Sequence, residues 1–171
     1  MTDPTVDPAL RSWVTVDQDS DFPIQNLPFG VFSSAGRSPR IGVAIGRDIV
    51  DVSSLSHAGV FDDSSLPTDL FSAATLNPFL ELGKPAWDSV RRELSSLLSD
   101  TSRRPSFPPE AFLVPMADAQ MHLPVDVGDY VDFYSSLEHA TNVGRLFRPD
   151  EPPLLPNWHH IPIGYHGRSS S

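Results

Sequence analysis

Residues 30–52 read GVFSSAGRSPRIGVAIGRDIVDV, and they set the fold class. Three short apolar or β-branched runs, at 30–34, 40–45 and 49–52, are separated by residues that favour turns. Short apolar runs punctuated by glycine, proline and serine are typical of antiparallel strands that follow one another in a meander. The stretch therefore predicts a small β-barrel or sandwich, in a mainly β protein with short helices (α+β).

The flanking segments add few helices to this core. Residues 1–21 are polar and are interpreted as a lead-in with one short strand at 12–16. Short helices are expected at 54–59 and 66–74. The strongest helix is expected at 85–98, because apolar residues recur there on one face of a 3.6-residue period. These residues are Trp87, Val90, Leu94, Leu97 and Leu98.

A polar, proline-rich link at 99–109 predicts a domain boundary shortly after it. We therefore expect a lead-in at 1–21, a β-barrel domain at 22–118 and the start of a second domain at 119–171. The 18 prolines among 171 residues favour short elements and ordered loops, because proline breaks helices and central strands.

Composition excludes several classes of partner and chemistry. The formal net charge of −10 disfavours binding to nucleic acid and to anionic membranes. The absence of cysteine rules out disulfides and thiolate catalysis. No apolar run approaches the roughly 20 residues that a membrane span needs, and the acidic N-terminus is unlike a signal peptide. The expected location is the cytoplasm.

Side chains that titrate near neutral pH are concentrated in residues 121–171, which hold five of the six histidines and all three tyrosines. The alternation at 128–134 sends Asp132 and Tyr134 to the same side of an extended segment. The sequence Ser135-Ser136-Leu137-Glu138 fits a capping box, so a helix should begin at Ser135 or Ser136. His139 then lies near a helix N-terminus, where the dipole favours the neutral imidazole that a general base needs.

Each of these residues also has a plainer interpretation, and spacing alone does not decide between the two. His139 could simply pack locally, and Asp132 could be a solvated loop carboxylate. One carboxylate is no metal site, and the surrounding aspartates do not match an EF-hand loop. Arg148 could clamp a carboxylate or form an exposed ion pair. Two glycines within 164–168 indicate a binding loop that permits close backbone approach.

A resemblance to a known family now becomes visible. The strings MHLP, DFYSS, HATNVG, LPNW and GYHGR, all within 121–168, resemble the fumarylacetoacetase family. The strings DSDFPIQNLPFGVFSSAGRSPRIGVAIGRDIVDVS, at 19–53, and TLNPFLELGKPAW, at 75–87, resemble its N-terminal domain. The resemblance implies a small Src-homology-3-like β-barrel followed by a mixed β-roll catalytic domain.

The resemblance also implies an activity. The family hydrolyses a carbon–carbon bond of 4-fumarylacetoacetate, a diketo acid, to fumarate and acetoacetate. This is the last step of tyrosine and phenylalanine breakdown, and the family performs it as a homodimer with Ca²⁺ or Mg²⁺. Matching the strings residue by residue, the resemblance implies that Asp132 is a metal carboxylate and His139 the general base. It implies that Tyr134, Arg148 and Tyr165 contact substrate.

In the family the remaining metal ligands, a Glu-x-Glu pair and a further aspartate, follow the YHGR segment, and residue 171 is reached first. We therefore expect an N-terminal fragment that binds metal poorly and has little activity alone. Two alternatives stay open. The chain could be a non-catalytic binding module, or the substrate could be another acylpyruvate-like diketone.

Overall fold

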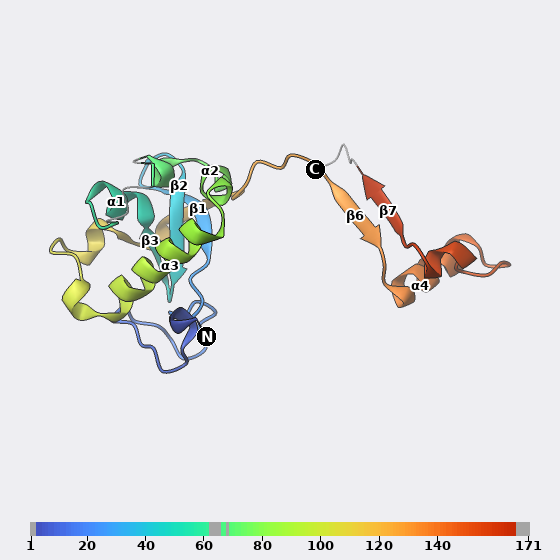
Figure 1. Ribbon diagram of the computed structural model, residues 1–171, viewed down its shortest axis with the longest axis horizontal. Helices are drawn as coiled ribbons and strands as arrows, with labels where there is room; N and C mark the ends of the chain where they lie inside the picture. The colour runs from blue at the N-terminus through green and yellow to red at the C-terminus, as the bar shows by residue number, and fades with distance from the viewer. Residues whose placement is uncertain (1–2, 62–65, 68, 167–171) are drawn as a thin grey trace. The chain divides into compact units, whose positions relative to one another are not determined.

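A computed structural model describes residues 3–61, 66–67 and 69–166, and the chain forms two compact units, Met1–Asp126 and Val127–Ser171. Both units combine helices with antiparallel strands (Figure 1). The expected mixture of β-structure with short helices is confirmed at this level. None of the helices in the described ranges is long and apolar enough to cross a membrane.

The first unit is built on a curled five-stranded sheet in the order β4-β3-β2-β1-β5 (Figure 1). All neighbouring strands are antiparallel. The predicted meander is confirmed, because its three strands follow one another through tight turns. The five strands are β1 (Phe29–Ser34), β2 (Arg40–Ile45), β3 (Asp48–Asp51), β4 (Leu113–Pro115) and β5 (Ala119–His122).

Helix α3 (Lys84–Ser99) covers one face of this sheet (Figure 1), and it confirms the helix expected at 85–98. Its side chains Val90, Leu94 and Leu98 belong to the same buried cluster as Val43 and Ile45 of β2. The other helices are short. They are α1 (Val52–His57) and α2 (Asn77–Glu81), with 3₁₀ turns η1 (Pro4–Val6), η2 (Leu70–Ser72), η3 (Thr101–Arg103), η4 (Pro109–Ala111) and η5 (Met116–Asp118).

The helix expected at 54–59 is confirmed as α1, which begins earlier because Asp51 caps it. The expected helix at 66–74 is reduced to the turn η2 in the described residues, and position 68 lies outside them. The strand expected at 12–16 is wrong. Ser12 and Trp13 instead donate hydrogen bonds to the carbonyl of Leu98, over 2.9 and 3.1 Å. The segment therefore satisfies orphan carbonyls at the end of α3 rather than joining the sheet.

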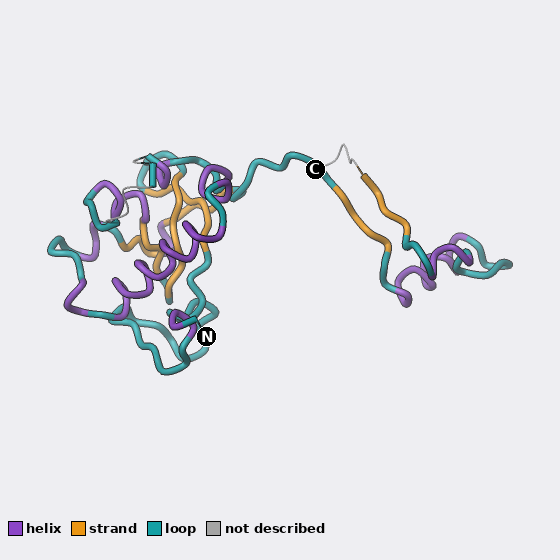
Figure 2. The backbone as a smooth tube through the Cα atoms, in the orientation of Figure 1, coloured by secondary structure: helices purple, strands orange, loops and turns teal. Residues whose placement is uncertain are grey.

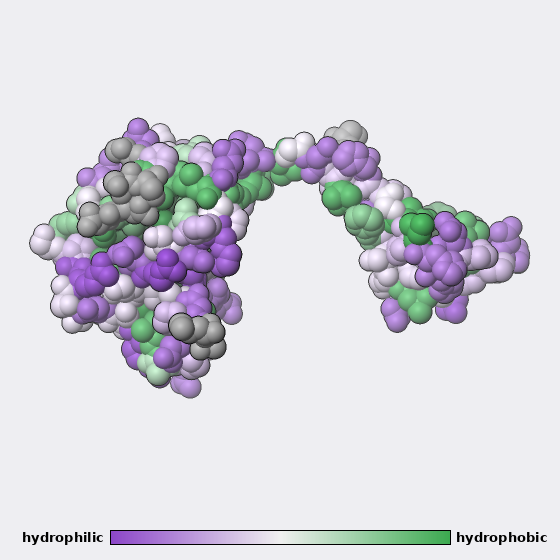
Figure 3. All heavy atoms as spheres, viewed as in Figure 1, coloured by the Kyte–Doolittle hydropathy of each residue, from purple (hydrophilic) through white to green (hydrophobic). Residues whose placement is uncertain are grey.

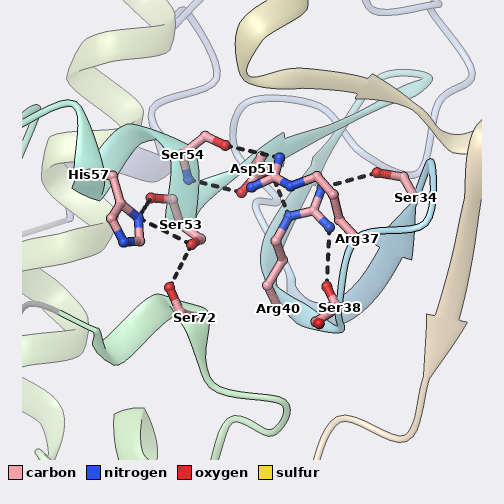
Figure 4. Close-up of polar contacts among 9 residues, drawn as sticks. All are labelled: Ser34, Arg37, Ser38, Arg40, Asp51, Ser53, Ser54, His57 and Ser72. Carbon is pink, nitrogen blue, oxygen red and sulfur yellow. Dashed lines mark hydrogen bonds and ion pairs between the residues drawn. The ribbon is translucent and has the colours of Figure 1, made fainter.

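A buried ion-pair network ties the sheet to α1 (Figure 4). Arg40 Nε lies 2.7 Å and Arg37 Nη1 3.0 Å from Asp51 Oδ2. The other carboxylate oxygen of Asp51 accepts a 2.9 Å bond from the Ser54 amide at the start of α1. Asp51 is 1% exposed and Arg40 4%, so this pair is buried in the core, whereas Arg37 is half exposed and reaches Asp51 from the surface.

The second unit is an antiparallel pair of strands joined by a helix and a returning segment (Figure 2). Strand β6 (Val131–Tyr134) pairs antiparallel with β7 (Ile163–His166). Helix α4 (Leu137–Phe147) and the turn η6 (Pro156–His159) lie between the two strands in sequence. Because Asp132 pairs with Tyr165 and Tyr134 with Ile163, these four side chains share one face of the strand pair.

The first compact unit ends at Asp126, whereas the sequence suggested a domain boundary at 118. Strand β5, which follows position 118, belongs to the first unit because it pairs with β1 from Val31 to Ser34. The family assignment of the segments 22–118 and 119–171 stays a prediction.

Candidate functional site

Four of the five residues singled out from the sequence line one pocket of about 370 Å³ in the second unit. Tyr134 comes from β6 and His139 from α4, while Arg148 caps the end of α4 and Tyr165 comes from β7. Asp132 is not part of the pocket wall, but it lies opposite Tyr165 in the strand register and on the same face of the strand pair. The structure therefore brings together residues up to 31 positions apart (134 to 165).

Local structure explains the position of His139. Ser136 is the N-cap of α4, and its hydroxyl accepts a 3.3 Å hydrogen bond from the His139 amide. The predicted helix start is thus confirmed, although Glu138 falls one position too early for the reciprocal bond of a capping box. The rings of His139 and Tyr134 meet edge to face, with centroids 5.3 Å apart. The imidazole is therefore held beside the tyrosine ring at one side of the pocket.

Two polar atoms of this pocket stand out because they are buried without a partner. In the described part of the chain, the Tyr134 hydroxyl and Arg148 Nε are buried and have no hydrogen-bond partner. Burying a polar group without a partner is unfavourable, so such groups in a native structure need an explanation. Both side chains line the same pocket.

The rest of the pocket wall was not foreseen from the sequence. It is mostly apolar, with Asn157 as an additional polar residue, and Val143 and Phe147 of α4 contribute to it. The returning segment adds Leu154, Leu155, Trp158 and Ile161, and the remaining lining residues are Ala140, Gly144 and Ile163. The signal in the sequence was the spacing of His139, Val143 and Phe147, which places them on one face of a helix.

The described residues do not by themselves present a divalent-cation site. No group of three or more histidine or acidic side chains that could hold a metal occurs in them. The Asp132 carboxylate accepts a 2.8 Å bond from the Tyr130 hydroxyl, and Asp129 lies 3.3 Å from His166 Nε2. Because Ca²⁺ takes six to eight oxygens and Mg²⁺ six, one carboxylate beside a tyrosine is insufficient.

The binding loop expected at 164–168 is described only in part. Gly164, Tyr165 and His166 belong to the strand β7 rather than to a loop, whereas positions 167 and 168 lie outside the described residues. The second unit also leaves several large apolar side chains exposed, and apolar (green) atoms are visible on its surface in Figure 3. They include Val131, Phe133, Leu146, Phe147 and Ile161.

Comparison with known proteins agrees with the resemblance in the sequence. A family model described as fumarylacetoacetase N-terminal matches residues 25–124. A Homo sapiens protein named fumarylacetoacetase is 50% identical over 164 residues, which cover 94% of this chain and 39% of the relative. Proteins of the same name from Caenorhabditis elegans and Arabidopsis thaliana are 49% and 44% identical, and each match covers 95% of this chain and 40% of the relative. The chain thus spans about two fifths of the length of these relatives.

Proposed function

This chain belongs to the fumarylacetoacetase N-terminal family, and from that premise we propose that it supplies part of an enzyme that hydrolyses 4-fumarylacetoacetate. The products would be fumarate and acetoacetate. The observation that carries the proposal is the pocket of the second unit, which gathers Tyr134, His139, Arg148 and Tyr165. Its two unpartnered buried polar atoms belong to Tyr134 and Arg148, two of the three residues proposed to contact substrate.

The chemistry follows from what these side chains can do. Water attacks a substrate carbonyl while His139 takes a proton from the water. A positioned base typically accelerates such a step 10²–10⁴-fold. The carbon–carbon bond then breaks, and its electron pair leaves with acetoacetate as an enolate that is later protonated. Arg148 suits a carboxylate of the substrate, because its guanidinium donates charge-assisted hydrogen bonds. Tyr134 and Tyr165 would orient the reacting carbonyl, which favours reaction by proximity.

We propose Asp132 as one oxygen ligand of a Ca²⁺ or Mg²⁺ ion. The described residues do not fit a whole site, so the other ligands would come from the part of the relatives that this chain does not span. When bound, the ion would act as a Lewis acid that stabilises the developing enolate. From the resemblance we also propose a Src-homology-3-like barrel, the start of a β-roll and a homodimer. From the composition we propose a cytoplasmic location. The curled antiparallel sheet supports the barrel.

A second candidate is a non-catalytic binding module. The observation in its favour is the exposed apolar surface of the second unit, at residues such as Phe133 and Phe147. Large exposed apolar patches mark interaction sites. In this reading the surface binds a protein partner, and the pocket is a remnant. The two readings differ in whether His139 matters for turnover.

The test uses a fusion protein in which this chain replaces the matching N-terminal residues of the human relative. The rest of the human protein follows it. Loss of the diketone absorbance of 4-fumarylacetoacetate measures turnover by this fusion and by the 171-residue chain alone. We expect turnover by the fusion, and a fall of roughly 10²–10⁴-fold for His139→Asn. His160→Asn is the matched control, because His160 is exposed and does not line the pocket. A fusion without turnover, or one indifferent to His139→Asn, would favour the binding module.

A further inference from the structure

Gly144 occupies an unexpected position for a glycine, in the third turn of the eleven-residue helix α4. Glycine within a helix is destabilising relative to alanine, because its backbone loses more conformational freedom on folding. Gly144 is also buried. Something at this position must therefore require the absence of a side chain.

The requirement is the close approach of Pro153. A Cβ added at Gly144 would collide with the carbonyl oxygen of Pro153 and would lie 2.7 Å from its carbonyl carbon and 3.0 Å from its Cα. These atoms are backbone, so they cannot swing aside as a flexible side chain would. The segment after α4 therefore rests directly on the helix at Gly144.

The same Pro153 carbonyl holds Arg148. Arg148 Nη2 donates a 2.8 Å hydrogen bond to Pro153 O. The Nε atom of the same guanidinium remains buried and has no partner in the described part of the chain. Because a guanidinium is planar and rigid, a bond at Nη2 also sets the direction of the N–H group at Nε. One carbonyl thus connects the contact at Gly144 with the orientation of Arg148.

We propose that Gly144 is a positioning residue for the ligand pocket. It lets the Pro153 carbonyl approach α4, and that carbonyl in turn orients the Arg148 guanidinium. The ligand group that Arg148 receives is a carboxylate. The role in substrate binding rests on the proposed function, whereas the orientation of Arg148 does not.

The first test measures the orientation directly in the 171-residue chain. The Nε–Hε signal of Arg148 is followed in ¹⁵N–¹H spectra and is assigned by its loss in Arg148→Lys. We expect Gly144→Ala to shift this signal while the backbone signals of α4 and β6 persist. Gly128→Ala is the matched control, because a Cβ there meets no atom within 4 Å; it should leave the Arg148 signal in place.

Each other outcome overturns the positioning role. An unchanged Arg148 signal in Gly144→Ala would mean that Pro153 does not set the orientation of the guanidinium. If the added methyl simply stabilises α4, as helix propensity alone predicts, the close approach is not a constraint. Loss of all dispersed signals from 127–166 would mean that Gly144 serves general packing instead.

The second test uses the fusion with the human relative. Gly144→Ala should raise KM with a smaller change in kcat, so that kcat/KM falls roughly tenfold to a hundredfold, as expected for a misplaced binding group. An unchanged KM alongside a shifted Arg148 signal would remove the link to substrate. If the unmodified fusion shows no turnover, the proposed function fails, while the spectra still decide whether Gly144 positions Arg148.

Discussion

Among single residues, Asp51 should contribute strongly to the stability of the first unit. Replacing it by alanine leaves Arg40 buried without its counter-charge and removes the cap of α1. Breaking a buried ion pair from one side typically costs 3–5 kcal/mol. We therefore expect Asp51→Ala to lower the free energy of unfolding, measured by urea titration, by about 3 kcal/mol.

The matched control is Asp17→Ala. Asp17 pairs with Arg47 over a similar 2.7 Å, but both side chains are exposed. Exposed pairs contribute about 0–1 kcal/mol, so this change should be small. Equal effects of the two substitutions would contradict the buried network as the source of stability.

Asp48 provides a pH-dependent prediction. Burial raises the pKa of its carboxyl above the ordinary 3.8, so the folded state binds the proton more tightly than the unfolded chain does. The stabilisation from this proton is complete below pH 3.8 and is lost as the pH rises through the folded pKa. Asp48→Asn should therefore raise the urea midpoint at neutral pH. Below pH 3.8 the two proteins should unfold alike, and a constant difference at both pH values would contradict this account.

At the scale of elements, the N-cap of α4 should control the turn that carries His139. Ser136→Ala removes the hydroxyl that accepts from the His139 amide, and loss of a serine cap costs about 1 kcal/mol. Hydrogen exchange at that amide should accelerate about fivefold. Ser135→Ala makes the same substitution one residue before the cap and should change little. Equal acceleration in both variants would show that the cap does not stabilise the turn.

The elements also show which local signals could be predicted from the sequence. Strands β1, β2 and β3 begin and end within about a residue of their apolar runs, because turn formers and β-branched residues act locally. Strands β4 and β5 were missed, because LVP has only three residues and AQMH contains no β-branched or aromatic residue. They join the sheet through their partners β3 and β1. Pairing with distant strands decides their conformation, and it cannot be inferred from either short segment alone.

The candidate site follows the same division. Alternation in β6 and the cap of α4 are local, and they placed Tyr134 and His139 from the sequence. Arg148 is held at the same pocket by the carbonyl of Pro153, in the segment that packs back onto α4 at Gly144. The proline-rich segment after α4 has no periodicity from which its return to the helix could be predicted. Arg148 was singled out by the family resemblance, and the structure shows the contact that holds it.

At the scale of the whole molecule, the first unit should fold on its own if the chain ends at Asp126. Every member of the buried core cluster, from Val14 to Phe112, lies within this unit. Ending the chain at 118, where the sequence suggested a domain boundary, would delete β5 and turn β1 into an edge strand that is paired only with β2. Unpaired edge strands are prone to aggregation.

The two truncations therefore give opposite expectations. The chain ending at 126 should unfold cooperatively in urea, with its near-ultraviolet circular dichroism retained before the transition. The chain ending at 118 should have a lower urea midpoint and should associate as its concentration rises, which light scattering would detect. Identical behaviour of the two truncations would mean that β5 contributes nothing to the first unit. In that case the domain boundary would lie where the sequence alone suggested it.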